Sequence, residues 1–96
     1  MDFSMICAHA TDVASRRIDG EVLLVDLQRN TLQVLNPVGA RLWELIDGQR
    51  TVADLAEVLF AKYAVGLKQA RADVQAFCED LTHRNVLIVV ERLSEI

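Results

Sequence analysis

The length and charge of the chain already limit its possible functions. Its 96 residues include 10 Lys and Arg and 14 Asp and Glu, which give a formal net charge of -4. A chain of this length forms one domain and is too short for two domains or for most self-contained enzyme scaffolds. An acidic chain also lacks the positive field that draws proteins onto phosphate backbones, so nucleic acid is a disfavoured partner.

The composition predicts a folded, cytoplasmic protein. Apolar residues make up 52% of the chain and charged residues 25%, which is typical of a folding sequence. The longest apolar run, residues 86–90, is far shorter than the ~20 residues that span a bilayer. The first ten residues contain no Lys or Arg, so we expect no secretory signal. Cys7 and Cys78 are too few for a disulfide scaffold and should stay as thiols in a reducing compartment.

The first third of the chain predicts three antiparallel strands. Residues 13–18 form a short candidate strand, and the Asp-Gly pair at 19–20 is a hairpin signal. Residues 21–27 are rich in Val and Leu, as expected of a second strand. Residues 28–30 then turn the chain into a third strand, 31–35.

The Asn36-Pro37 pair marks a change from strand to helix. An Asn side chain caps a helix, and Pro in the first helical position loses no needed N–H. We therefore expect a helix over 37–47, ended by Gly48 in a left-handed conformation.

Two further helices follow. Thr51 and Asp54 resemble a capping box, which predicts a second helix over 51–64. The third helix is expected over 67–84, with Asn85 as its terminator because Asn tolerates left-handed backbone. One apolar stripe runs along that helix through Leu67, Ala70, Val74, Phe77, Cys78 and Leu81.

Residues 86–90 are apolar and predict a short closing strand. The resulting order is a three-stranded antiparallel sheet, three helices and a short C-terminal strand. We therefore predict an α+β, winged-helix-like fold. Residues 1–12 are expected to be a mobile N-terminal arm, and residues 13–96 a single domain.

Metal binding and catalysis find little support in the sequence. Cys7, His9, Cys78 and His83 are competent zinc ligands, but Cys78 and His83 are five apart on a helix and point to different faces. We expect Cys78 to be buried and His83 to be solvated. No nucleophile has a base placed beside it, and the glycines form no phosphate loop. We therefore predict no catalytic residue, no metal and no cofactor.

A winged-helix order also raises a second hypothesis, a nucleic-acid-binding regulator that reads DNA with its third helix. The charges on that helix argue against it, because bases and acids balance and leave no net attraction to phosphate. These residues are Lys68, Arg71 and Arg84 on one side and Asp73, Glu79 and Asp80 on the other.

The third strand is an unguarded sheet edge. Exposed edges are normally protected by charge, Pro or a bulge, because free N–H and C=O groups recruit other strands. The first strand carries Arg16 and Arg17, whereas residues 31–35 include no charge, Pro or Gly. Two explanations stay open: the edge is covered by this protein or a second copy, or it accepts an extended peptide.

Several motifs together resemble the PqqD family, the small peptide-recognition proteins also called RiPP recognition elements. The likeness covers about residues 18–90. It rests on Leu35-Asn36-Pro37, Ala40, Trp43, Leu45, Asp47-Gly48, Thr51-Val52, Leu55, Tyr63, Asp73-Val74, Phe77, Leu81 and Leu87-Ile88.

The resemblance implies a noncatalytic peptide chaperone. Such a protein holds the leader segment of a ribosomally made precursor peptide and presents it to a modifying enzyme, which is a radical-SAM enzyme, a cyclase or a leader peptidase. In the family the leader pairs with the third strand and lies against the third helix. The acidic charge and the short apolar runs separately predict that neither nucleic acid nor a membrane is a partner, and a homodimer is an alternative way to satisfy the edge.

The resemblance also carries a site prediction. The strand part of the site is the third strand, which contributes Thr31, Leu32, Gln33, Val34 and Leu35. The helix part is one contiguous flank, for which we choose Arg71, Val74, Gln75 and Cys78. In this hypothesis Arg71 pairs with a leader carboxylate, Val74 and Cys78 form the apolar floor, and Phe77 and Leu81 face the core.

Overall fold

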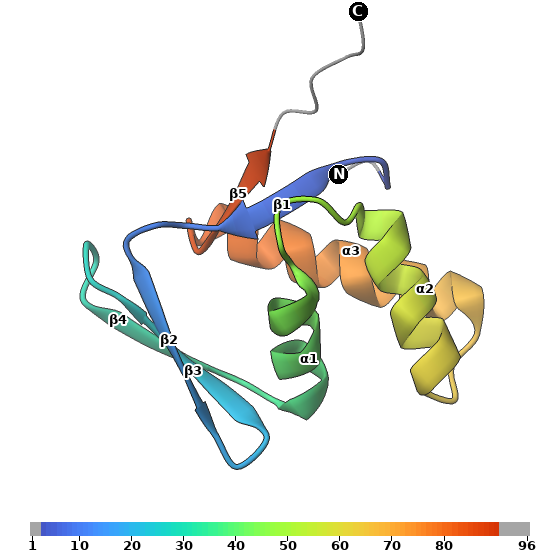
Figure 1. Ribbon diagram of the computed structural model, residues 1–96, viewed down its shortest axis with the longest axis horizontal. Coiled ribbons are helices and arrows are strands. Elements are labelled where there is room, and N and C mark those ends of the chain that lie inside the picture. Colours follow the sequence, from blue (N-terminus) through green and yellow to red (C-terminus); the bar gives the residue numbers. More distant parts are fainter. Residues whose placement is uncertain (1–2, 91–96) are drawn as a thin grey trace, which may run out of the picture.

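The computed structural model describes residues 3–90 as two small sheets and three helices (Figure 1). The elements, in chain order, are β1 (Ile6–His9), β2 (Val13–Ile18), β3 (Glu21–Asp26), β4 (Thr31–Leu35), α1 (Pro37–Leu45), α2 (Val52–Lys62), α3 (Leu67–His83) and β5 (Leu87–Val90). The predicted α+β class, with three antiparallel strands, three helices and a C-terminal strand, is confirmed.

The three-stranded sheet has the order β2-β3-β4 and is antiparallel throughout. Asp19 and Gly20 form the turn between β2 and β3 with φ angles of 50° and 84°. Two consecutive positive φ angles define the type I′ turn, whose twist matches that of the flanking strands. Asn30 takes the positive φ of 54° at the end of the next turn.

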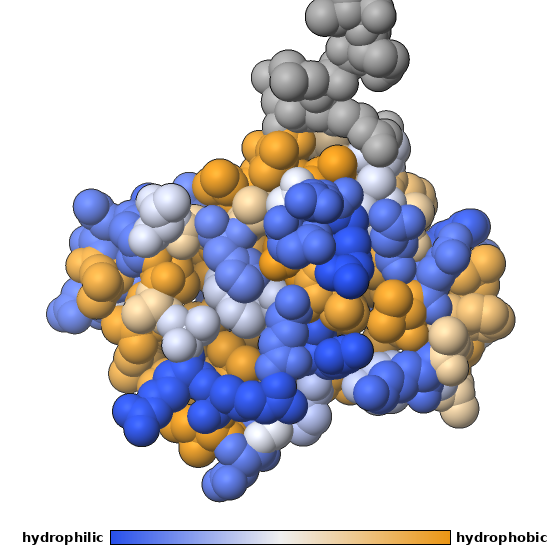
Figure 2. All heavy atoms as spheres, in the orientation of Figure 1, coloured by the Kyte–Doolittle hydropathy of each residue, from blue (hydrophilic) through white to orange (hydrophobic). Residues whose placement is uncertain are grey.

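The two faces of this sheet have different environments. Val22 and Leu24 of β3 and Leu35 of β4 are buried against the helices, on the side where α1 packs. Leu32 and Val34 point to the opposite face and are 71% and 61% exposed. Apolar surface therefore remains over the sheet in the space-filling view (Figure 2).

The helices begin at the residues that the sequence predicts. The Asn36 side chain accepts a hydrogen bond of 2.8 Å from the Gly39 N–H at the start of α1. At the start of α2, Thr51 and Asp54 each accept a bond from the other's backbone N–H, which is the expected capping box. Asn85 follows α3 with a φ of 64°, the left-handed conformation predicted for a helix terminator.

The N-terminal segment differs from the expectation of an arm outside the domain. β1 pairs antiparallel with β5, from Ile6 opposite Val90 to His9 opposite Leu87. Ile6 and Cys7 are buried, and Cys7 belongs to the main hydrophobic core. β1 was not predicted, because its partner lies at the opposite end of the chain and no nearby turn indicates the pairing.

The loop between α1 and α2 covers the other side of β1. The backbone N–H of Gly48 bonds to the carbonyl of Cys7 at 3.2 Å, and the N–H of Val52 bonds to the carbonyl of Met5 at 2.9 Å. A second sheet, β1-β5, is thereby joined to the helices. Residues 91–96, the end of the predicted domain, lie outside the described residues.

Trp43 lies at the centre of the packed helices. It is 3% exposed, and the His9 ring stacks on its indole with centroids 3.6 Å apart. His9 Nε2 also lies 2.8 Å from the Trp43 carbonyl oxygen, so β1 is fixed to α1 by its last residue. Within residues 3–90, no helix is both long and apolar enough to cross a membrane.

Candidate functional site

The backbone of β4 has one free edge, and the hairpin register shows which groups point outward. The pair Ile18 and Glu21 flanks the two-residue turn between β2 and β3. In such a hairpin this pair exchanges both of its hydrogen bonds. Successive residues of a strand bond to opposite sides, so Val22 and every second residue after it bond toward β4.

The same alternation continues into β4. Val22 is paired with Leu35, and Leu24 is paired with Gln33. Leu35 and Gln33 therefore use their N–H and C=O groups in hydrogen bonds to β3. Leu32 and Val34 lie between these positions and direct their backbone groups away from β3. Each offers one donor and one acceptor at the free edge, without breaking any bond within the sheet.

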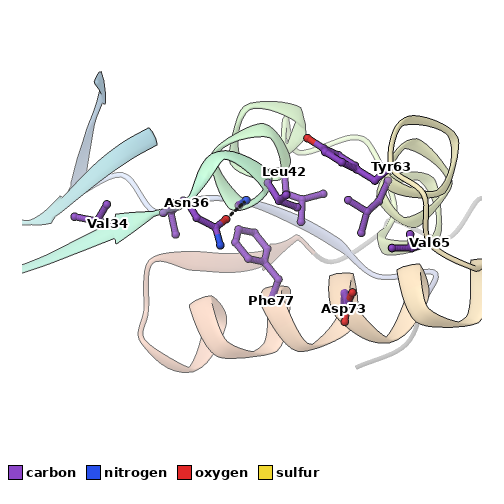
Figure 3. Close-up of a pocket in the computed structure, with 11 residues that line it drawn as sticks. Val34, Asn36, Leu42, Tyr63, Val65, Asp73 and Phe77 are labelled. Carbon is purple, nitrogen blue, oxygen red and sulfur yellow. Dashed lines mark hydrogen bonds between the residues drawn. The ribbon is translucent and has the colours of Figure 1, made fainter. Parts of the chain in front are cut away.

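Two cavities lie between β4 and α3, one at each end of the strand, and together we call them the groove; the larger of the two lies where β4 ends. At that end, which we call the apolar end, a cavity of about 480 Å³ lies among β4, α1, α2 and α3 (Figure 3). Most of its wall is apolar. The lining residues are Val34, Leu35, Asn36, Val38, Gly39, Leu42, Leu59, Tyr63, Val65, Asp73 and Phe77.

Phe77 separates the apolar end from the core. Its ring rises from α3 toward the junction of β4 and α1, beside Asn36 (Figure 3). Gly39 leaves room for that ring, because a Cβ atom at this position would lie 3.2 Å from Phe77 Cε1. Phe77 is half-buried, since one side packs on the core and the other faces the cavity.

Among residues 3–90, Asp73 supplies the only carboxylate in the wall of the apolar end. It lies one helical turn before Phe77 on α3, and its Oδ1 accepts a hydrogen bond of 2.7 Å from Gln69 Nε2. An exposed carboxylate beside apolar surface repels another negative charge and attracts donors and cations. Asp73 therefore makes this end of the groove negative.

The opposite end of the groove, which we call the basic end, has the opposite character. A cavity of about 300 Å³ lies where β4 begins and α3 ends. It is lined by Arg29, Thr31, Leu32, Gln33, His83, Arg84, Asn85 and Val86. Two guanidinium groups and an imidazole border this end, and no carboxylate of the described residues, 3–90, lines it.

The predicted strand residues line the groove, whereas the predicted helix residues do not. Thr31, Leu32, Gln33, Val34 and Leu35 all line one of the two cavities, so the structure brings the whole strand to the groove. Val74 and Cys78 are 0% exposed in the core. They cannot form the floor of an open groove, so the role predicted for these two residues is wrong.

Arg71 and Gln75 lie on a third side of α3. With Phe3, Leu67, Lys68 and Ala72 they line a separate cavity. The Arg71 guanidinium carbon is 5.8 Å from the centre of the Phe3 ring, a cation–π distance. This flank of α3 therefore borders the N-terminal segment, and the cavities beside β4 have other lining residues.

Asp73 and Phe77 of α3 line the groove but were not predicted as site residues. Phe77 belongs to the apolar stripe and was expected in the core, whereas Leu81 was correctly expected there and is 1% exposed. The i, i+4 spacing of Asp73 and Phe77 was available as a signal. Periodicity alone cannot tell which margin of a stripe borders a groove.

The two cysteines are neighbours in the core. Cys7 of β1 and Cys78 of α3 are 3% and 0% exposed. A hydrogen bond from the Cys78 thiol lowers the pKa of Cys7 to about 7, while the same contact and burial raise the pKa of Cys78. His83 is solvent-exposed, as expected. Among residues 3–90, no three His, Cys, Asp or Glu side chains gather as a metal site.

A family model described as "Coenzyme PQQ synthesis protein D (PqqD)" matches residues 21–87. The match begins with β3 and ends at the first residue of β5, so it includes the free edge and the whole of α3. No curated protein matches the sequence.

Solved structures share the fold. One, described as "TbiB1 in Complex with the TbiA(beta) Leader Peptide", is 28% identical, with a TM-score of 0.79 over 84% of this chain and 94% of that chain. A second, "Lasso peptide synthetase B1 complexed with the leader peptide", is 20% identical, with a TM-score of 0.79 over 85% and 96%. A third, "Structure of the heterocyclase TruD", is 14% identical, with a TM-score of 0.63, and matches 95% of this chain but 12% of that chain.

Proposed function

The chain belongs to the PqqD family, and from this premise we propose that it is a noncatalytic recognition domain for the leader segment of a ribosomally made precursor peptide. The observation that carries the proposal is the free edge of β4 beside an apolar groove. Leu32 and Val34 present unpaired backbone groups there, and Phe77 and its neighbours line the cavity at the end of the strand. The similar TbiB1 structure contains a leader peptide, which supports the same role for this chain.

Strand addition and the groove are both needed to explain useful affinity. The four free backbone groups of Leu32 and Val34 contribute roughly 2–6 kcal/mol if each new hydrogen bond is worth about 0.5–1.5 kcal/mol. Micromolar binding requires about 8 kcal/mol. A leader side chain of Leu size that becomes buried in the apolar end adds ~1.5–3 kcal/mol. Backbone pairing therefore supplies sequence-tolerant affinity, and the cavity supplies selectivity.

We further propose that the bound leader is presented to a modifying enzyme. The candidates are a radical-SAM enzyme, a cyclase or a leader peptidase. The fold supports this idea, because it also matches a small part of a heterocyclase chain and a protein described as "Lasso peptide synthetase B1". Co-purification with the enzymes encoded near its gene tests this partner. A cytoplasmic location also stays a prediction, which cell fractionation checks.

The test of strand addition is Val34→Pro. Proline removes the free N–H of residue 34 without taking a donor from the β3 ladder. We expect the variant to remain folded and to bind leader peptides encoded beside its gene at least tenfold more weakly, as measured by calorimetric titration. Amide NMR shifts in the unsubstituted protein should concentrate on β4 and on Asp73 and Phe77.

Ser15→Pro is the matched control. By the same alternation, residue 15 directs its N–H to the outer edge of β2, at the other side of the sheet. This variant carries the same backbone restriction but leaves β4 intact. Equal leader affinity in a folded Val34→Pro protein, or an equal loss in Ser15→Pro, would show that peptides do not bind by pairing with β4.

A further inference from the structure

The groove is electrostatically polarised along its length. Asp73 lies in the wall of the apolar end, near the last residue of β4. Arg84 and His83 border the basic end, near the first residue of β4, with Arg29 of the preceding turn. Asp73 in α3 lies beside the last residue of β4, and Arg84, directly after α3, lies beside the first, so this part of the chain runs antiparallel to β4. Opposite charges therefore lie at the two ends of the strand.

The lengths of the two elements agree. Four residue steps from Thr31 to Leu35 cover about 14 Å of an extended strand. Eleven steps from Asp73 to Arg84 cover about 16 Å of helix. An extended peptide that pairs with all of β4 therefore reaches from Asp73 to Arg84.

Arg84 and Arg29 at the basic end each use only part of the guanidinium group in bonds within the protein, so each can also bind a ligand. Arg84 uses Nε on Asp80 at 3.0 Å, and both side chains are more than half exposed. Arg29 uses one Nη1 contact of 3.4 Å to Asp26, whose carboxylate is buried and also binds two backbone N–H groups. Exposed pairs of this kind contribute ~1 kcal/mol or less, so an incoming carboxylate can share the guanidinium groups.

We propose that the groove selects a leader segment in which an apolar residue is followed four positions later by Asp or Glu. This inference rests on the proposed leader-binding function and specifies the chemistry of the peptide. The apolar side chain enters the apolar end beside Phe77, and the carboxylate meets Arg84 at the basic end. Asp73 repels a carboxylate at the wrong end, so the same charges fix the direction of the peptide.

The spacing of four follows from the pleat of the sheet. Thr31, Gln33 and Leu35 share the face that packs toward the helices, because Leu35 is buried there and strand side chains alternate. A peptide residue opposite Leu35 points to the same face, as does the residue opposite Thr31. In an antiparallel pair, the pairing that the whole sheet uses, the residue opposite Thr31 comes four positions later.

The experiment begins with selection from a displayed library of random twelve-residue peptides against the folded protein. We expect the selected peptides to share an apolar residue with an acidic residue at the fourth position after it. NMR shifts on β4 with a selected peptide test leader-type strand addition separately from the charge pattern. Peptides that bind β4 with no acidic preference overturn this inference and leave the proposed function intact.

Charge exchange then tests Arg84 directly. For a selected peptide, Arg84→Glu should weaken binding by roughly two- to tenfold, as expected for an exposed ion pair replaced by repulsion. The peptide with Lys in place of its acidic residue should recover affinity with this variant. Arg16→Glu, on the β2 strand at the opposite edge of the sheet, makes the same charge change and should alter affinity less than twofold.

Asp80→Asn should change peptide affinity in the opposite direction to Arg84→Glu. Removal of the carboxylate that bonds Arg84 Nε frees that guanidinium, so affinity for the acidic peptide should rise by about two- to fivefold. Unchanged affinity in both Arg84→Glu and Asp80→Asn, with peptide shifts still on β4, would refute the role of the basic end. Failure of every peptide to bind β4 would refute the proposed function itself.

Discussion

Two aspartates stabilise their turns through the same local arrangement. Asp26 accepts hydrogen bonds from the backbone N–H groups of Gln28 and Arg29, both at 3.0 Å. Asp47 accepts bonds from Gln49 and Arg50 at 2.9 and 3.0 Å, and each aspartate also pairs with the arginine three positions later. The shared pattern Asp-x-Gln-Arg therefore builds two turns, one before β4 and one before α2.

These bonds predict how stability depends on pH. The backbone N–H of Arg29 holds the pKa of Asp26 below its ordinary value of 3.8, and the N–H of Arg50 does the same for Asp47. A carboxylate with a lowered folded pKa stabilises the protein above its ordinary pKa, and this contribution disappears as the pH falls through the folded pKa. We expect the urea midpoint to fall as the pH is lowered from 5 toward 2.

The variants Asp26→Asn and Asp47→Asn isolate these contributions. Each should lower the midpoint at pH 7 and flatten its dependence on pH, because asparagine keeps the shape but not the charge. Asp12→Asn is a suitable control, since that side chain is not part of either turn. An unchanged slope in both test variants would mean that other carboxylates carry the acid sensitivity.

At the scale of elements, β1 connects parts of the chain that are far apart in sequence. It pairs with β5 on one side, and on the other side the carbonyl of Cys7 accepts a backbone bond from Gly48 in the loop between α1 and α2. Ile6 and Cys7 are buried in this position. β1 therefore contributes to the core as well as to the second sheet.

This role predicts the effect of a truncation. A chain that begins at residue 11 loses β1, and the burial of Ile6 alone is worth ~1.5–3 kcal/mol. We expect the free energy of unfolding, measured in urea, to fall by at least that amount, and the amides of β5 to lose protection from hydrogen exchange. Ile6→Ala should give part of the same loss. Full stability in the truncated chain would restore the boundary predicted at residue 13.

At the scale of the whole molecule, the free edge of β4 is too short to form a stable dimer interface by itself. Ile18, Leu32 and Val34 are exposed, and β4 offers an edge of only five residues. Stable interfaces bury about 800 Å² on each partner. In sedimentation at micromolar concentration we therefore expect a monomer of 10.7 kDa. A dimer that Val34→Pro dissociates would show that a second copy occupies the edge instead.

Most of the fold could be predicted because its signals are local. The turn at Asp19-Gly20, the caps at Asn36 and Thr51 and the left-handed Asn85 each depend on a few neighbouring residues. The absence of charge in residues 31–35 likewise identified the free edge before any tertiary contact was known. The register of the first hairpin then determines that Leu32 and Val34 are the residues with free backbone groups.

The pairing of β1 and the flank of α3 that borders the groove depended on tertiary structure. Ile6 lies opposite Val90 of β5, and the three helices separate these two residues in the sequence. Val74, Cys78 and Phe77 all belong to one apolar stripe, and only the packing of α1, α2 and β1 determines that the first two are enclosed while Phe77 borders the cavity. Helical periodicity defines which residues share a face, but the surrounding elements determine which part of that face stays open.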